Sequence, residues 1–245
     1  MRSFFFYFGV ISLVVIVVGG SFCFWKFSPF IFAKSRSQSL SHSDRSAISL
    51  PEPALSGGIS VEEALASRRS VRSFQDTPIS MEDLSQVLWS AQGVTDREKG
   101  HRAAPSAMAL YPLTVYVVAE KVDGLSQGLY RYEPGHRLVP VFDGPAKDRT
   151  MTAIRQPWIM SAPAILLISG RYDDLRGTFG DAAEFCVHAE VGHVSQNVYL
   201  QAQSIGLGTL ASGGIDGDKL KDAFGLPSEE SFLYAMPLGR PQEGR

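Results

Sequence analysis

Polar and apolar positions from residue 59 onward alternate with periods typical of both helices and strands. Ser60 followed three residues later by Glu63, and Ser80 followed by Asp83, are typical of helix N-termini, where a hydroxyl caps a free backbone N–H. Apolar residues then recur at helical spacing, in the second case until Gly93. We therefore predict two helices near the start of the folded region.

The middle of the chain contains short runs rich in β-branched and aromatic residues, bounded by turn residues. We predict strands at 113–119, 128–132, 138–142 and 164–169. The second and third flank Pro134-Gly135 and indicate a hairpin, whereas the fourth is apolar throughout and indicates a buried strand.

The longest predicted helix covers 181–204, because Val187, Val191, Val194 and Val198 form one apolar stripe. A short strand at 207–211, a helix at 216–224 and a strand at 232–238 follow. Helices and strands do not alternate regularly, so the pattern favours an α+β fold over a doubly wound sheet.

A different pattern precedes this region. Residues 4–25 carry no charge, and as a helix they would span roughly 33 Å, enough for a hydrocarbon core of about 30 Å. We predict a single transmembrane helix within residues 1–27, and we favour an uncleaved anchor over a cleaved signal peptide. Lys26, Lys34 and Arg36 favour a cytoplasmic location of the domain that follows.

Residues 28–58 are rich in serine and contain Pro51 and Pro53. Such a composition buries little apolar surface, so we predict a flexible linker without a fold of its own. The folded domain is expected at 59–245.

Composition and charge exclude some classes of function. The 245 residues are 44% hydrophobic and 20% charged, as in globular proteins, and the net charge is −2. This charge offers no basic field for nucleic acid. Two distant cysteines exclude a disulfide framework.

The first candidate site residues are Arg68, Arg69, Ser70 and Arg72, at the end of the first predicted helix. Three guanidinium groups and a hydroxyl suit a phosphate, because arginine presents a rigid fork of donors. The alternative is that these residues form a solvated basic end of the helix, because positive charges interact favourably with the dipole at a helix C-terminus.

Two other segments contain small residues that let a ligand approach the backbone. One is 103–112 with Ser106, for which an ordinary connection is the alternative. The other is the glycine-rich run 206–214, whose spacing differs from that of a dinucleotide loop. His188, Glu190 and His193 lack the spacing of a metal motif, and we interpret them as structural.

Taken together, these motifs resemble the nitroreductase-like flavoproteins, especially their SagB-type branch, whose best-known members dehydrogenate azolines in ribosomal peptides. The resemblance spans residues 61–241 and is carried by six segments: 68–72, 104–112, 128–132, 190–197, 206–209 and 237–241. It implies a nitroreductase-like fold with a mainly antiparallel central sheet flanked by helices.

The resemblance also implies a homodimer that binds FMN at its interface, with NAD(P)H as a possible electron donor and a small molecule or peptide as substrate. The cofactor-binding residues that it implies are Arg68, Arg69, Ser70, Arg72, Ser212, Gly213, Gly214 and Arg240, together with Pro105, Ser106 and Ala107 of the partner subunit. It implies no metal and no obligatory catalytic side chain, although Tyr111, Glu190 and His193 merit testing.

Three functions follow as hypotheses. The first is an FMN oxidoreductase that transfers hydride between a reduced donor and an organic acceptor. The second is a non-catalytic flavin-fold binding module. The third is a peptide azoline dehydrogenase that works with a separate cyclodehydratase. Azoline-oxidising relatives tend to carry Lys-Tyr before the long helix, where this chain has Thr178-Phe179, which puts the third hypothesis in doubt.

Overall fold

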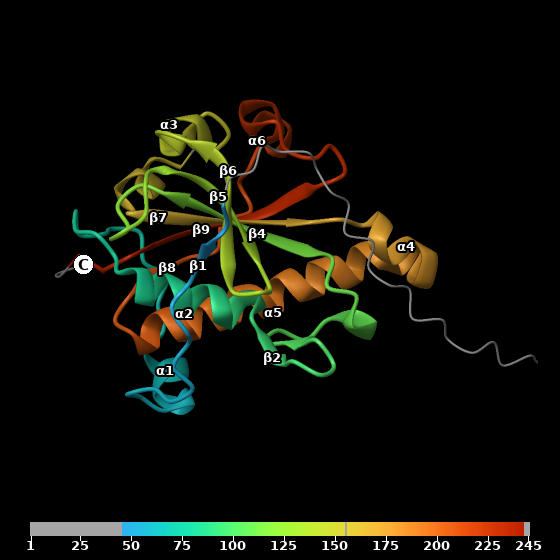
Figure 1. Cartoon of the computed structure of the whole chain (residues 1–245), viewed down its shortest axis with the longest axis horizontal. Helices are drawn as coiled ribbons and strands as arrows, with labels where there is room; N and C mark the ends of the chain where they lie inside the picture. The colour runs from blue at the N-terminus through green and yellow to red at the C-terminus, as the bar shows by residue number, and fades with distance from the viewer. Residues whose placement is uncertain (1–45, 155, 243–245) are drawn as a thin grey trace, which may run out of the picture. The chain divides into compact units, whose positions relative to one another are not determined.

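A seven-stranded sheet in the order β1-β6-β5-β4-β7-β9-β8 forms the centre of the domain, and all its pairings are antiparallel (Figure 1). The computed structural model describes residues 46–154 and 156–242, all within one compact unit. The strands of this sheet are β1 (Ile48–Ser49), β4 (Leu113–Ala119), β5 (Gly128–Glu133), β6 (Arg137–Asp143), β7 (Ala164–Gly170), β8 (Gly208–Thr209) and β9 (Ser231–Gly239).

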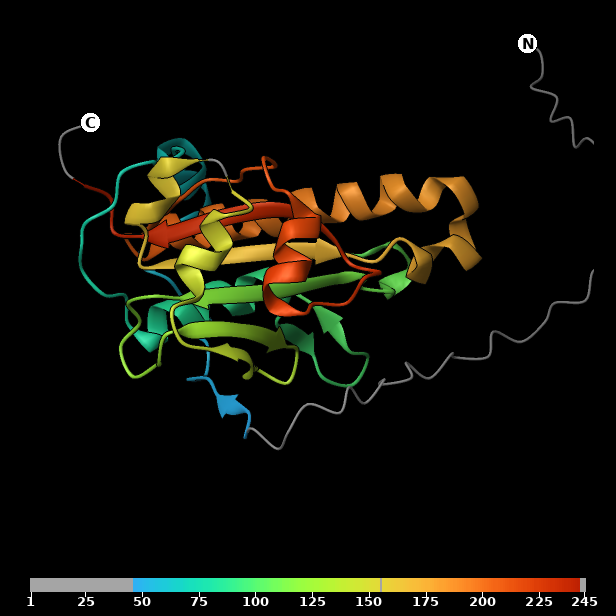
Figure 2. The ribbon, with the colours of Figure 1, turned by 90° about the horizontal axis from the view of Figure 1, so that it is seen from above.

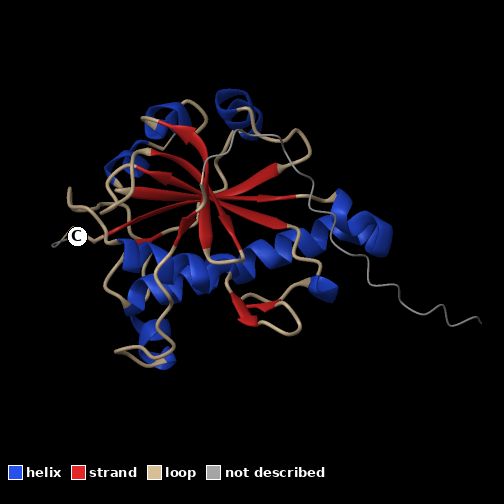
Figure 3. Cartoon of the chain, viewed as in Figure 1, coloured by secondary structure: helices blue, strands red, loops and turns tan. Residues whose placement is uncertain are grey.

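Helices lie on both sides of the sheet, as Figure 3 shows. They are α1 (Val61–Ser67), α2 (Met81–Gln92), α3 (Ala146–Met151), α4 (Asp173–Phe179), α5 (Ala183–Ser204) and α6 (Gly217–Phe224). Short 3-10 helices occupy Ala107–Ala109, Pro157–Ser161 and Gly180–Ala182, and a small hairpin joins β2 (Val94–Asp96) to β3 (His101–Arg102). The predicted α+β class with an antiparallel sheet flanked by helices is confirmed.

Local sequence explains why these helices begin and end where they do. The hydroxyls of Ser60 and Ser80 accept hydrogen bonds from the backbone N–H groups of Glu63 and Asp83, at 3.1 and 3.0 Å. The valine stripe of α5 is buried against the sheet, and α5 also packs against α2 (Figure 2). Burial of this stripe, more than helix propensity, stabilises the helix.

Two hydrophobic cores lie on opposite faces of the sheet. Along β4, Val115 and Val117 belong to the core under α2 and α5, whereas Tyr116 and Val118 belong to the core under α3 and α6. Side chains alternate between the faces of a strand, so a strand buried on both faces is apolar throughout. This explains the continuous apolar runs predicted as strands.

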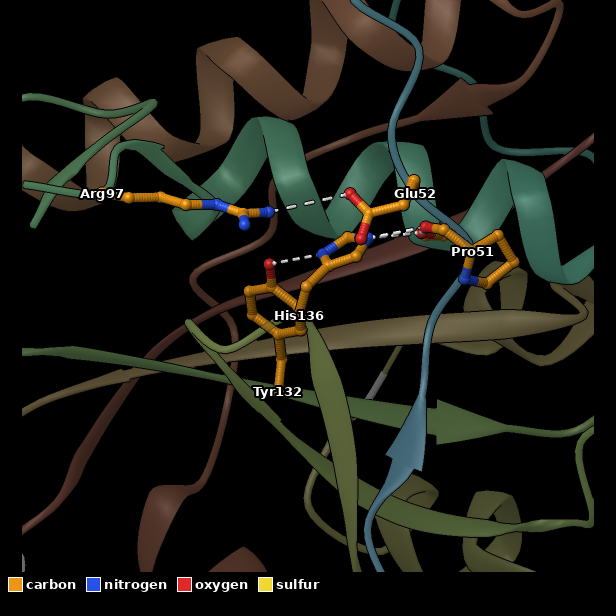
Figure 4. A network of polar contacts seen from close by, with 6 residues as sticks. Pro51, Glu52, Arg97, Tyr132 and His136 are labelled. Atoms are coloured by element: carbon orange, nitrogen blue, oxygen red, sulfur yellow. Dashed lines mark hydrogen bonds and ion pairs between the residues drawn. The ribbon is translucent and has the colours of Figure 1, made fainter.

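The segment predicted as a linker is shorter than expected. Residues 48–49 pair with β6, and Leu50 is buried. The Pro51 carbonyl lies 2.8 Å from His136 Nε2, while the Tyr132 hydroxyl lies 3.0 Å from His136 Nδ1 (Figure 4). The prediction of a domain beginning at residue 59 is therefore wrong, because apolar Ile48 and Leu50 add a strand to the sheet edge despite the polar composition around them.

The predicted transmembrane helix, residues 1–27, and linker residues 28–45 lie outside the described residues. Within residues 46–154 and 156–242, no helix has the length and apolar character needed to cross a bilayer.

Candidate functional site

The Arg68–Arg72 segment leaves the end of α1 and runs along β8. Arg68 ends α1, its N–H donating to the Ala64 carbonyl at 2.9 Å. The Val71 N–H then donates to the Thr209 carbonyl at 3.0 Å, and Ser70 and Thr209 form an isolated parallel β-bridge. The fold thus joins the basic motif to the glycine-rich run, although 137 positions (71 to 208) separate Val71 from Gly208 in the chain.

Close contact between these two segments requires a glycine at position 208. A Cβ there would lie 2.6 Å from Val71 Cγ2, which is closer than real Cβ atoms approach. We predict that Gly208→Ala displaces the Ser70–Arg72 segment and costs about 1–3 kcal/mol of stability, as overpacking does. Chemical denaturation measures the loss, and Gly177→Ala, at an open position, is the matched control. Equal stability of the two variants would contradict the packing argument.

Tyr199 of α5 connects the two segments a second time. Its hydroxyl accepts a hydrogen bond from the Ala211 N–H at 2.8 Å and lies 3.4 Å from Ser70 Oγ. The Arg68 guanidinium lies 5.0 Å from the centre of its ring, within cation–π range. The sequence analysis missed Tyr199, although its position directly after Val198 in the apolar stripe placed it beside the core.

The four arginines of the predicted site differ in their partners. Among the residues that the structure describes, neither Arg68 nor Arg72 forms an ion pair, and the Arg72 guanidinium lies 6.0 Å from the centre of the Trp158 ring. Arg69 instead donates to the carbonyls of Ala66 and Arg68, at 3.0 and 2.8 Å. The helix-end interpretation therefore fits Arg69, whereas Arg68 and Arg72 are available to an anion.

Arg240 follows β9 and lies at the same end of the site. Its Nη2 is 3.4 Å from Asp83 Oδ2. Its Nη1 lies beside Gly206, since a Cβ added to that glycine would be 3.8 Å from it. Because β9 pairs with β8, Arg240 is held beside the basic motif, but Asp83 partly neutralises it.

The loop 212–214 presents its backbone at the surface. Ser212 is buried and exchanges two backbone hydrogen bonds with Ala235, at 2.9 and 3.0 Å. Its hydroxyl donates to Gln156 Oε1 at 2.6 Å and accepts from the Gly214 N–H at 3.3 Å. Gly213 and Gly214 are exposed, so a flat ligand can reach their backbone. Gln156, which braces this loop, was not predicted from the sequence.

Pro105, Ser106 and Ala107 are not connected to the other predicted residues. Within the described residues, no hydrogen bond, ion pair or ring contact joins them to 68–72 or to 212–214. The Ser106 hydroxyl accepts the Tyr111 N–H at 2.9 Å instead. One subunit therefore brings together eight of the eleven predicted residues, and the other three stay assigned to a partner subunit by prediction only.

The residues of this site fit a phosphate-bearing ligand. Two arginines lack carboxylate partners within the described part of the chain, and a loop of exposed glycine backbone lies on the neighbouring strand.

A cleft of about 320 Å³ lies elsewhere, between α1, α2, α5 and the segment before α1. Its lining includes Leu55, Trp89, Asn197 and Gln201, but none of the predicted cofactor-binding residues. This cleft is therefore separate from the predicted cofactor site.

Comparison with known proteins supports the fold and identifies the family. The nitroreductase family model matches residues 65–240. A Methanocaldococcus jannaschii protein, provisionally named a nitroreductase, is 40% identical over 187 residues, which are 76% of this chain and 93% of that protein. The FMN reductase [NAD(P)H] of Bacillus subtilis is 25% identical over 197 residues, 75% of this chain and 66% of that enzyme.

Solved structures share the architecture. A crystal structure from Ralstonia eutropha, provisionally described as a nitroreductase, has a TM-score of 0.70 at 26% identity and covers 83% of this chain and 93% of that chain. A chain of the Escherichia coli microcin synthetase McbBCD complex has a TM-score of 0.62 at 18% identity, covers 88% of this chain and 85% of that chain, and is similar in fold alone. With the family model matching 176 of its 245 residues (65 to 240), this chain belongs to the nitroreductase family.

Proposed function

We propose that this nitroreductase-family protein is an FMN-dependent oxidoreductase that transfers hydride from NAD(P)H to a small organic acceptor. The observation that carries the proposal is the junction of the Arg68–Arg72 segment with β8 and the 212–214 loop. Two arginines without ion pairs in the described residues lie at one end of this junction, and open glycine backbone lies at the other. FMN has the matching parts, a phosphate at one end and a flat ring at the other.

Each group of residues would perform a separate task. Arg68 and Ser70 would hold the phosphate, assisted by Arg240, because charge-assisted hydrogen bonds to phosphate are strong. Arg72 would lie toward the ring, where Trp158 limits its movement. The 212–214 backbone, braced by Gln156, would provide donors along the ring edge. Bound FMN supplies the hydride chemistry, and the protein supplies position and polarity.

We also propose that the active form is a homodimer in which Pro105, Ser106 and Ala107 of one subunit complete the site of the other. Within the described residues of one chain, these residues have no hydrogen bond, ion pair or ring contact with the rest of the site, which supports this arrangement. The exposed apolar side chains Val61 and Leu65 of α1 and Met108 of the loop would then be covered.

The direct test is reduction of the bound flavin. We expect the purified full chain with FMN to lose its flavin absorbance under anaerobic NADH or NADPH, and to recover it when a nitroaromatic or quinone is added. A protein that binds FMN but is reduced by neither nucleotide would contradict the proposed donor. A colourless protein that takes up no flavin would favour the non-catalytic binding module.

Azoline oxidation in peptides is the second candidate. Its support is the shared fold with a chain of McbBCD, a complex solved with truncated pro-MccB17 bound. Thr178 and Phe179, at the end of α4, offer no basic group in the place where azoline-oxidising relatives carry one. Reconstitution with a cyclodehydratase and a precursor peptide separates the candidates, since we expect the azoline to remain unoxidised.

We further propose that residues 1–27 anchor the protein in a membrane with the catalytic domain in the cytoplasm. The uncharged run of 22 residues supports this arrangement. We expect the full chain to sediment with membranes after alkaline washing, and a variant lacking residues 1–27 to stay in solution. A mature protein whose N-terminus begins after residue 25 would show a cleaved signal peptide instead.

A further inference from the structure

A network of hydrogen bonds connects the 104–112 loop to α5. Within the loop, the Ser106 hydroxyl accepts the Tyr111 N–H at 2.9 Å. The Arg102 N–H donates to the Tyr111 hydroxyl at 3.0 Å, and Arg102 Nη1 donates to Gln92 Oε1 at 2.9 Å. Gln92 Nε2 donates to Glu190 Oε1 at 3.5 Å and connects this network to α5. Three elements, α2, β3 and α5, therefore hold one loop.

Glu190 is the acidic member of this network and belongs to α5. The residue is 2% exposed, and among the described residues its Oε2 has no hydrogen-bond partner. Burial raises the pKa of its carboxyl, while hydrogen bonds, Arg102 of β3 and His193 of α5 lower it. A buried carboxyl is costly without such partners, so its presence here needs an explanation beyond helix stability.

The loop that Glu190 holds has an unusual backbone. Met108, Ala109 and Tyr111 have φ angles of 52°, 55° and 50°, in the left-handed region that non-glycine residues rarely adopt. Such a conformation persists only where surrounding contacts enforce it. The Arg102 guanidinium, 4.3 Å from the centre of the Tyr111 ring, adds to these contacts. The loop tip nevertheless exposes Met108 to solvent, at 64% of its surface.

We propose that Glu190 is a positioning residue that acts across the dimer: through Gln92 and Arg102 it fixes the strained loop whose Pro105–Ala107 segment completes the FMN site of the neighbouring subunit. This inference rests on the proposed function. It explains why a network of buried polar groups supports a loop that, within the described residues, has no hydrogen bond, ion pair or ring contact with the rest of the site in its own chain. The buried carboxyl and the backbone strain keep the loop in one shape.

The first test measures FMN dissociation constants of full-chain variants by flavin fluorescence quenching. We expect Glu190→Ala to weaken FMN binding about tenfold or more, which corresponds to one lost hydrogen bond to a charged group. Glu190→Gln keeps an acceptor for the Gln92 amide and should stay within about threefold of the wild type. Gln92→Leu breaks the network at α2 and should weaken binding in the same direction. Glu184→Gln, at an exposed position of α5, is the matched control.

The second test uses mixed dimers, in which differently tagged Glu190→Ala and Arg68→Ala subunits are co-expressed and purified through both tags. If Glu190 acts across the dimer, one site carries both defects and the other carries neither. We therefore expect one FMN per mixed dimer, bound with wild-type affinity. If Glu190 acted in its own subunit's site, each site would carry one defect and no wild-type site would form.

Different results would contradict the role of Glu190 and the proposed FMN-dependent function. A wild-type protein that binds no FMN overturns the proposed function. A wild type that binds FMN, with Glu190→Ala and Gln92→Leu binding it equally well, overturns the role of Glu190 alone. Mixed dimers without a wild-type site overturn its action across the dimer.

Discussion

Replacing Arg68 by alanine is expected to weaken FMN binding about 10- to 100-fold, equivalent to about 1.5–3 kcal/mol for a lost hydrogen bond to a charged group. Arg68 is half-buried over the Tyr199 ring and has no carboxylate partner among the described residues, so its guanidinium is held in place without being neutralised. Isothermal titration with FMN measures the effect.

Two matched variants make this result specific. Arg69→Ala should change the FMN dissociation constant less than about threefold, because Arg69 already donates to the carbonyls at the end of α1. Arg176→Ala removes an equal charge from α4, where Arg176 pairs with Asp173, and should leave binding unchanged. An Arg69→Ala effect larger than that of Arg68→Ala would reverse the assignment of the phosphate ligand.

Glu230→Ala is expected to lower the free energy of unfolding by about 2–4 kcal/mol. Glu230 is 5% exposed, accepts hydrogen bonds from the Tyr116 hydroxyl at 3.0 Å and from the Ser169 hydroxyl at 2.6 Å, and has no place in the proposed site. In the variant, the Tyr116 and Ser169 hydroxyls stay buried but lose the carboxylate as their hydrogen-bond acceptor, which costs free energy. Urea unfolding measures the loss, and the exposed Glu229→Ala is the control. A loss below about 1 kcal/mol would contradict this assignment.

The pH dependence of the Glu230→Gln variant gives a related prediction. Burial raises the pKa of the Glu230 carboxyl above its ordinary value, despite hydrogen bonds and arginines that lower it. The native state therefore holds this proton more tightly than the unfolded chain does. Stability from this group is complete below the unfolded pKa and is lost as the pH rises through the native pKa. Glu230→Gln should gain stability relative to the wild type across that range, and parallel curves would contradict the raised pKa.

Local patterns were sufficient to predict most of the secondary structure. The serine caps at Ser60 and Ser80 start helices, because a capping bond involves residues three apart in the chain. The strand at residues 113–119 has the predicted bounds, since its apolar run is buried on both faces of the sheet. The spacing of apolar side chains indicates which face of an element is buried, and this burial determines whether the segment forms a helix or a strand.

Contacts between distant residues could not be predicted in this way. Gln156 and Ser212 are 56 residues apart in the chain, and Ser70 and Tyr199 are 129 apart. No local sequence pattern therefore predicts that either pair is in contact. The strand at Ile48–Ser49 was missed because its pairing with β6 depends on an available sheet edge. The division of roles between Arg68 and Arg69 likewise depends on which guanidinium reaches the end of α1.

The central claim is that the Arg68–Arg72 segment binds the phosphate of FMN, and comparison of FMN with riboflavin tests it most directly. Riboflavin has the same ring system but no phosphate, so the two ligands differ only in the group that the arginines would bind. We predict that the full chain binds one FMN per subunit and binds riboflavin at least about 100-fold more weakly, as loss of charge-assisted hydrogen bonds implies. Equal affinity for the two ligands, or binding of neither, would contradict the account.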